Sequence, residues 1–567
     1  MRTALLTTPL ILLISFLMTI SASASEQDSV CAFDYYLEGV REYCAGNYEK
    51  SAKLLSECIK SDPENDAAYY YMAMTELTAE DIDQAMHYLD RAITLSPDNE
   101  NYRVLLARMY TEIGEPELAI GIFKTLTEKN PGKSEYYYEL IDLYVRNDNL
   151  DSALVSLDRI EQIRGRTELT CNARYEILSM KGEYAMAEDV LKRMDEDFPS
   201  ARTSLMLGDI YKAAYNDSCA LYYYDRAVAL DPGFTPAYFG IAEIYRVRRD
   251  FQKFFSNIDK FLSSPDMNPS LKTQYLEEVV FASGMAAVFR PQTDTLVYHT
   301  LNAHPADTSV LTMAGLYSIA TDSVDKGLEF LRENIRLHPD VKSARTVYMG
   351  QLYSLQRWDG LIDAATETER AFPDDFMLKE FLAIAYWQKD QPGKAAGVYE
   401  SILRQIPDDH PMLINCYAAL GDLYHETGNR RKAYSYYEKG LRIDDNYSPI
   451  LNNYAYFLSE EGRNLKKAVE MSRKTILNEP ENSTYLDTYG WLMYLTGDYE
   501  EARKYLKKAM VYGGKESAVI LDHYAEALFA LKEYNLAFLY WSNAEKLDPD
   551  LGIGKKIIEK RKECGRQ

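Results

Sequence analysis

The sequence predicts an all-α protein, a solenoid of about 14–15 stacked helical hairpins that ends in a capping helix. Apolar and small residues recur with the spacing of one helix face through most of the chain. The second observation is the repeat length, because two runs of prolines stand 34 residues apart: Pro63, Pro97 and Pro131, then Pro305, Pro339, Pro373 and Pro407. A single hairpin cannot bury its apolar side, so hairpins of this kind must stack on one another.

The clearest unit covers residues 483–516. Its first helix has apolar or small residues at i, i+3, i+4 and i+7 from Leu486, and its second helix has them at i, i+4 and i+7 from Ala502. Gly497 and Asp498 predict the turn between the two helices. Small residues on the facing sides allow the two antiparallel helices to approach closely.

This unit resembles the tetratricopeptide repeat, a helix–turn–helix of 34 residues with the pattern W-x2-L-G-x2-Y…A-x3-F…P. Leu486 replaces the aromatic residue at the start of the pattern, and Gly513-Gly514 replace its closing proline. The resemblance covers nearly all of the chain beyond its N-terminal segment. It implies a right-handed α-solenoid, but it implies no reaction and names no partner.

Residues 1–24 have the features of a secretory signal peptide. Arg2 is the one charge before an apolar run over 4–20, and Ala22-Ser23-Ala24 has the small-residue pattern of a cleavage site. An uncleaved N-terminal anchor is the alternative, although the run is short for a membrane span. Residues 25–31 follow as a short polar leader.

The repeats divide into two arrays, expected over 32–265 and 308–550, and a capping helix is expected over 551–567. Between the arrays, residues 266–307 contain several prolines and lose the repeat pattern. We expect a divergent hairpin there, with one long helix over 271–289 and a short one over 295–302. Drift of one repeat and a functional hinge both fit this segment.

Composition excludes several classes of partner. The formal net charge is −24, whereas nucleic acids and anionic membranes attract basic surfaces, so neither is expected as a partner. The seven cysteines are irregularly spaced and do not form a disulfide framework. A local Cys31–Cys44 bridge is the alternative, based only on their proximity in sequence.

The sequence contains no recognisable catalytic constellation. Gly132-Lys133-Ser134 resembles the end of a phosphate-binding loop, but Thr127 stands where its first glycine is needed. The seven histidines are scattered, and only His299 and His304 lie close together. We therefore expect no enzymatic activity, no cofactor and no metal site.

The candidate binding residues come from the family resemblance. In tetratricopeptide arrays the first helices line the concave face, and the positions that commonly touch a ligand there carry aromatic and polar side chains in this chain. Aromatic residues of this kind supply much of the energy at binding surfaces. In residues 483–516, three such residues are not required by the packing pattern of the repeat, namely Asp487, Trp491 and Tyr494. The expected groove residues are Tyr70, Arg108, Tyr138, Asp142, Asp209, Lys212, Phe239, Arg246, Trp387, Asp422, His425, Asp487, Trp491 and Tyr494.

The sequence thus predicts an exported scaffold that binds a protein or peptide partner through its concave groove, in an assembly of the cell envelope. It would be periplasmic or envelope-associated in a Gram-negative bacterium and secreted otherwise. The alternative is a protein that binds carbohydrate or an envelope polymer through the aromatic residues of the groove.

Overall fold

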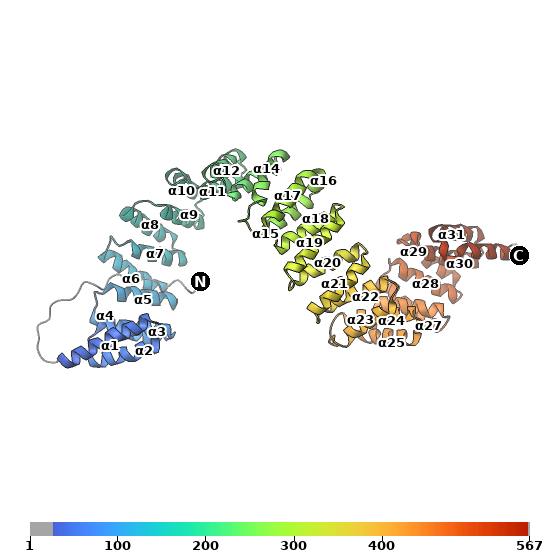
Figure 1. Ribbon diagram of the computed structural model, residues 1–567, viewed down its shortest axis with the longest axis horizontal. Coiled ribbons are helices and arrows are strands. Elements are labelled where there is room, and N and C mark those ends of the chain that lie inside the picture. Colours follow the sequence, from blue (N-terminus) through green and yellow to red (C-terminus); the bar gives the residue numbers. More distant parts are fainter. Residues whose placement is uncertain (1–25, 565–567) are drawn as a thin grey trace. The chain divides into compact units, whose positions relative to one another are not determined.

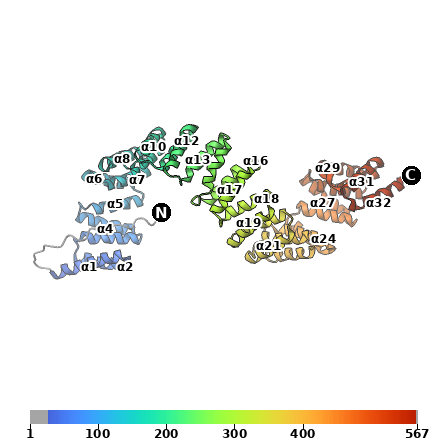
Figure 2. The ribbon, with the colours of Figure 1, turned by 45° about the horizontal axis from the view of Figure 1, so that its top comes forward.

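The computed structural model describes residues 26–564, so the predicted signal peptide lies outside the described residues. Within residues 26–564 the chain forms 32 α-helices and no β-strand, which confirms the all-α prediction. Contacts divide the chain into two compact units between Phe261 and Leu262. In each unit consecutive helices pair as hairpins, and successive hairpins lie side by side (Figures 1 and 2).

The first unit contains seven hairpins, each made of a first and a second helix joined by a short turn. In chain order the pairs are α1 (Glu26–Cys44) and α2 (Tyr48–Ser61), α3 (Asp66–Thr78) and α4 (Ile82–Leu95), α5 (Glu100–Glu112) and α6 (Pro116–Lys129), α7 (Ser134–Arg146) and α8 (Leu150–Arg164), α9 (Glu168–Met180) and α10 (Tyr184–Asp197), α11 (Ala201–Ala213) and α12 (Asp217–Leu230), and α13 (Thr235–Val247) and α14 (Phe251–Leu262).

The second unit begins with a divergent segment and continues with seven regular hairpins and a last helix. The segment comprises α15 (Pro269–Tyr275), a π-helix over Leu276–Phe281, α16 (Met285–Val288) and α17 (Arg290–Ala303). The regular pairs are α18 (Thr308–Ala320) and α19 (Val324–Leu337), α20 (Lys342–Ser354) and α21 (Trp358–Ala371), α22 (Phe376–Gln388) and α23 (Pro392–Leu403), α24 (Leu413–Glu426) and α25 (Arg430–Ile443), α26 (Ser448–Glu460) and α27 (Leu465–Asn478), α28 (Ser483–Leu495) and α29 (Tyr499–Val511), and α30 (Ala518–Ala530) and α31 (Tyr534–Leu547). The last helix, α32 (Ile553–Cys564), supplies the predicted cap.

Small residues set the distance between the two helices of a hairpin. In α28, a Cβ atom added to Gly490 would lie 2.6 Å from Cγ of Leu506 in α29. Leu506 and the neighbouring Ala502 and Ala509 are fully buried there. A larger residue at position 490 would therefore force the hairpin apart, which explains the small residue that the repeat pattern requires.

Most hairpins turn through one residue in the left-handed region. Glycine takes this position in several turns, for example Gly497. Nine residues other than glycine also have positive φ within the described chain, with values from 50° to 66°: Glu80, Asp148, Tyr215, Arg249, Asp322, Gln356, Asp390, Asn464 and Lys532. Each carries a local backbone cost that glycine would avoid.

The divergent segment corrects one expectation. The single helix expected over 271–289 is wrong, because the π-helix follows α15 and Gly284, with φ of 75°, then breaks the run before the short α16. The helix expected over 295–302 is longer, since α17 begins at Arg290 with Pro291 in its first turn. Proline is tolerated in the first turn of a helix because a backbone N–H there would have no partner within the helix.

A buried lysine holds the divergent segment to the first residues of the second unit. The side chain of Lys272 is 0% exposed. Its Nζ donates to the carbonyl oxygens of Leu262, at 2.9 Å, and of Ser264, and lies 2.9 Å from Nε2 of His304. Burial lowers the pKa of Lys272 to about 8.

Two further findings concern the chain as described. None of the helices in residues 26–564 has the length and apolar character that a membrane crossing requires. Cys44 is an exposed free thiol, so the Cys31–Cys44 bridge considered above is absent.

Candidate functional site

A groove of about 650 Å³ crosses five successive first helices of the second unit. Side chains from α22, α24, α26 and α28 line it, and its far end is closed by the start of α30. The structure brings four of the predicted residues together in this groove: Trp387, Asp422, His425 and Asp487. Sequence reasoning missed other lining residues, namely Glu426, Asn452, Asn453, Tyr456, Phe457, Thr484, Thr488, Ser517, Val519 and Ile520.

Asp422 lies at the centre of a directional hydrogen-bond network. The buried Tyr437 hydroxyl of α25 donates to its carboxylate, and Nδ2 of Asn453 donates to the same oxygen at 3.0 Å. Asn453 then accepts from Nδ2 of Asn452 at 3.2 Å. Because a carboxylate only accepts, this order leaves Oδ1 of Asn452 as a buried acceptor without a partner in the described residues. Burial raises the pKa of Asp422 above its usual range.

His425 is packed face to face on Phe457. The two ring centroids lie 3.5 Å apart and the rings are inclined by 8°. Burial lowers the pKa of His425, so the imidazole is neutral at pH 7, and its Nε2 is a second buried polar atom without a partner among the described residues. A buried polar atom without a hydrogen-bond partner lowers the stability of the fold by about 1–3 kcal/mol. A ligand that supplies the missing hydrogen bond would recover this free energy.

Two pairs of successive first helices are joined by side-chain contacts. Nε1 of Trp387 donates to Glu426 at 2.7 Å. Nδ1 of His523 lies 3.0 Å from the carboxylate of Asp487, which is 6% exposed. The indole of Trp491 stacks on the His523 ring with centroids 4.1 Å apart. These contacts join helices α22 to α24 and α28 to α30.

The three residues of 483–516 that the repeat pattern does not require thus have structural partners. Asp487 and Trp491 both contact His523, and the hydroxyl of Tyr494 donates to Glu526 of α30 at 3.1 Å. These contacts do not test whether the three side chains bind a ligand, which stays a prediction. The partners lie 32–36 residues away, in the next repeat.

The predicted residues of the first unit lie along successive first helices and make pairwise contacts. Arg108 pairs with Glu139 of the next hairpin at 2.7 Å, and Lys212 lies over the ring of Phe239 at 5.9 Å. Asp209 accepts from the hydroxyl of Tyr224 at 2.6 Å. The remaining residues make similar contacts or are exposed: Tyr70 stacks on Tyr102, Asp142 pairs with Arg146, Arg246 bonds Glu243, and Tyr138 is 37% exposed.

The groove is acidic. Asp422, Glu426 and Asp487 line it, and none of its lining residues is lysine or arginine. It suits a ligand that brings positive charge or hydrogen-bond donors. Among the residues that the structure describes, no three His, Cys, Asp or Glu side chains are grouped so that they could hold a metal ion.

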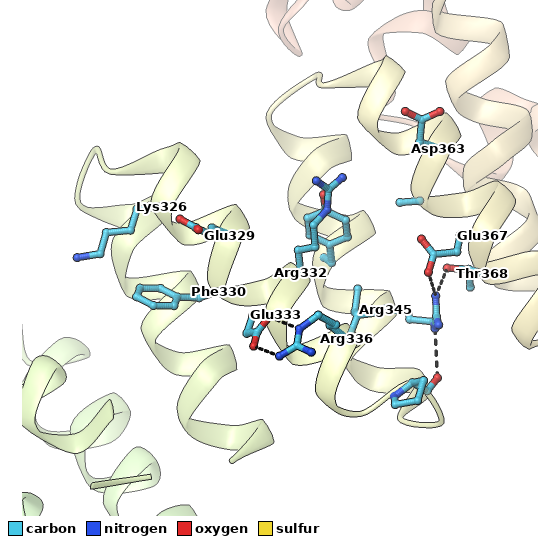
Figure 3. Close-up of a pocket in the computed structure, with 14 residues that line it drawn as sticks. Lys326, Glu329, Phe330, Arg332, Glu333, Arg336, Arg345, Asp363, Glu367 and Thr368 are labelled. Carbon is cyan, nitrogen blue, oxygen red and sulfur yellow. Dashed lines mark hydrogen bonds and ion pairs between the residues drawn. The ribbon is translucent and has the colours of Figure 1, made fainter. Parts of the chain in front are cut away.

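A second depression, of about 870 Å³, lies between α19 and α21 and behaves differently (Figure 3). Four basic and four acidic side chains line it, and several neutralise one another. Arg336 makes two hydrogen bonds to Glu333, and the buried Arg345 lies 3.8 Å from Glu367. With its charges balanced internally, this depression selects no sign of ligand charge.

An all-α array whose first helices share a polar and aromatic groove is the architecture of a repeat scaffold. Residues 45–141 match a model of the tetratricopeptide repeat in two overlapping segments, and residues 414–447 match another. The chain therefore contains tetratricopeptide repeats, which in general provide scaffolds for protein–protein interaction.

Individual relatives are distant. The TPR repeat-containing protein YpiA of Bacillus subtilis is 21% identical over 421 residues, which cover 72% of this chain and 94% of the relative. A TPR repeat-containing protein of Methanocaldococcus jannaschii is 20% identical over 531 residues, or 90% of this chain and 80% of the relative. The crystal structure of a tetratricopeptide repeat protein from Parabacteroides merdae is 15% identical, with a TM-score of 0.36, and covers 45% of this chain and 98% of that one.

Proposed function

We propose that the groove over α22–α30 binds an extended protein segment that carries basic side chains. The observation that carries the proposal is the lining itself: five consecutive first helices contribute to one acidic depression. Packed helices lie about 8–10 Å apart, so five of them span about 32–40 Å. An extended chain advances about 3.3 Å per residue, so about ten to twelve residues would span the length of the groove.

The chemistry of the lining supports a peptide. A backbone N–H could donate to Oδ1 of Asn452, and a lysine or arginine side chain could pair with Glu426, which is exposed at the rim. Arginine in particular suits carboxylates because its donors form a planar fork. The three carboxylates of the lining would disfavour an acidic segment.

The carbohydrate alternative receives less support. A sugar ring needs an open aromatic face, whereas the face of Phe457 is covered by His425 and the face of Trp491 by His523. The rings of Phe457 and Trp491 therefore help to join repeats, which favours a peptide ligand over a glycan.

The groove can be tested by filling it. Thr484 and Val519 are exposed lining residues, so Thr484→Arg with Val519→Arg should add bulk and positive charge without disturbing the core. Random ten-residue peptides displayed on phage and panned on the immobilised chain should be enriched in lysine and arginine. The double variant should bind the selected peptides at least about tenfold more weakly, the scale of one buried ionic contact.

A matched control is Thr346→Arg, which changes an exposed threonine of α20 outside the groove. It should bind the same peptides as the unchanged chain does. Selected peptides without basic residues, or equal binding by the double variant, would refute the proposed groove.

The place of action is a further part of this proposal. The apolar run and the Ala22-Ser23-Ala24 pattern support export, and an acidic scaffold of this length suits an assembly of the cell envelope. A mature N-terminus at Ser25 in the mass of the protein from its native cells would agree with export, and an intact Met1 in the cytosolic fraction would contradict it. Partners captured from envelope extracts should be lost after protease treatment.

A further inference from the structure

A third depression, of about 600 Å³, lies between the second helices α29 and α31 and shares no residue with the groove. Its floor is apolar, because Met510 and Leu521 are buried and Tyr540 is half-buried. Its outer wall includes two exposed apolar side chains, Val511 and Leu547. This size and lining are typical of sites for small molecules.

An unusual connection forms this depression. Four connections between regular hairpins of the second unit have four residues, as between Asn478 and Ser483, and the one after α23 has nine, whereas six residues separate α29 from α30. Gly513 has φ of 109°, and a Cβ atom on Gly514 would lie 2.8 Å from the carbonyl oxygen of Ala509. Both glycines are therefore required, and the short 3-10 turn that follows carries Lys515 to the edge of the depression.

The charge around this depression has one sign. Lys507, Lys515 and Lys546 line it, and no carboxylate does. In the described part of the chain none of the three lysines forms an ion pair, although the protein as a whole carries a charge of −24. The depression of Figure 3 is the contrast, since its basic side chains face as many acidic ones.

We propose that this depression binds a small amphiphilic anion, namely an acyl chain that ends in a carboxylate. The chain would lie on Met510, Leu521 and Tyr540, where it leaves water, and the carboxylate would lie among the three lysine ammonium groups. An apolar floor without the lysines would accept any hydrophobic compound, and the lysines without the floor would hold any anion weakly. The two features together select a ligand that has both.

Decanoate is a suitable probe, with acetate and decanol as its two halves, in titration calorimetry on the full chain. Decanoate should bind at least about tenfold more tightly than either half, and added salt should weaken it. The triple variant Lys507→Glu, Lys515→Glu and Lys546→Glu should lose at least about tenfold in affinity, since three exposed charges reverse. Val511→Ser should also weaken decanoate binding, because it removes part of the apolar wall.

Lys508→Glu is the matched control, because Lys508 is the exposed neighbour of Lys507 but does not line the depression. It should bind decanoate as the unchanged chain does, and unchanged melting temperatures establish that every variant is folded. The proposal is overturned if decanoate does not bind, if acetate or decanol binds equally well, or if the triple variant retains its affinity.

Discussion

At the scale of single residues, one arrangement recurs in both units and fixes the position of an aspartate that the sequence predicts to bind a ligand. In α11, Gly208 makes room for the ring of Tyr224, whose hydroxyl donates to Asp209; in α24, Gly421 makes room for Tyr437, which donates to Asp422. The glycine admits a large ring from the second helix, and the ring then fixes the carboxylate beside it. Asp209 and Asp422, which the sequence predicts to contact a ligand, thus also have a structural role.

Gly421→Ala tests this arrangement. Its Cβ atom would lie 2.1 Å from Cε1 of Tyr437, whose ring is fully buried. We expect a loss of about 1–3 kcal/mol in the free energy of unfolding, the usual cost of overpacking, measured by denaturant titration of the helical signal.

Gly397→Ala is the control for that variant, because nothing lies within 4 Å of a Cβ atom there and the residue is inside α23. It should stabilise the protein by about 0.5–1 kcal/mol through helix propensity alone. Equal effects of the two substitutions would show that the packing argument fails.

The sequence predicts that Asp209 and Asp422 face the groove, but not what holds them. The tyrosine that binds each carboxylate is 15 residues further along, on the other helix of the hairpin. Helical periodicity relates residues on one helix, so it cannot reveal a pair that forms across the turn. His523, Glu426 and Glu526 were missed for the same reason, since their partners belong to the preceding repeat.

At the scale of elements, the divergent segment contains a buried lysine side chain. The pKa of Lys272 is about 8 in the folded chain, whereas a solvated lysine has a pKa of about 10.4. Between these values the unfolded chain binds more protons than the folded chain, so the free energy of unfolding should rise with pH. Below pH 8 Lys272 is protonated in both the folded and the unfolded chain, so it adds no pH dependence to the free energy of unfolding.

Lys272→Met should remove that rise. The measurement is the difference in melting temperature between the variant and the unchanged chain, from pH 7 to pH 10 at constant salt. The melting temperature of the unchanged chain should rise relative to that of the variant as pH increases above 8. A constant difference over this range would contradict the burial argument.

The regular hairpins were predictable because their apolar spacing and their prolines agree over many copies. Residues 271–289 lack that redundancy, and their apolar run fits one helix as well as two. Gly284 at positive φ and the π-helix before it decide the outcome, and neither follows from propensity alone. The depression between α29 and α31 was missed because two extra residues in a connection say nothing about the space they open.

At the scale of the whole molecule, tyrosine dominates the titration behaviour. The chain has 47 tyrosines, and burial raises the pKa of many of them, to about 12 for Tyr36, Tyr43, Tyr436 and Tyr456. A group whose pKa is higher when folded contributes stability that is complete below its unfolded pKa, about 10 for tyrosine, and is lost as pH rises toward the folded value.

The protein should therefore unfold cooperatively in mild alkali. We expect the melting temperature to fall steeply above about pH 10, and tyrosinate absorbance to appear together with the loss of helical signal. Ionisation of most tyrosines near pH 10 with the helices intact would contradict this expectation. Measurements in high salt separate the effect from general charge repulsion, which salt would reduce.

The left-handed turn residues have a consequence for how such a chain changes over evolutionary time. Nine turns hold a side chain where glycine would fit without strain, at about 1 kcal/mol each. These positions, such as the 94% exposed Tyr215, lie at the surface and touch little of the core. A lineage could exchange glycine for other residues there one turn at a time. These nine turn positions can therefore change almost independently of one another. Substitutions there can alter the stability of the protein, in evolution or by engineering, while its binding surfaces stay the same.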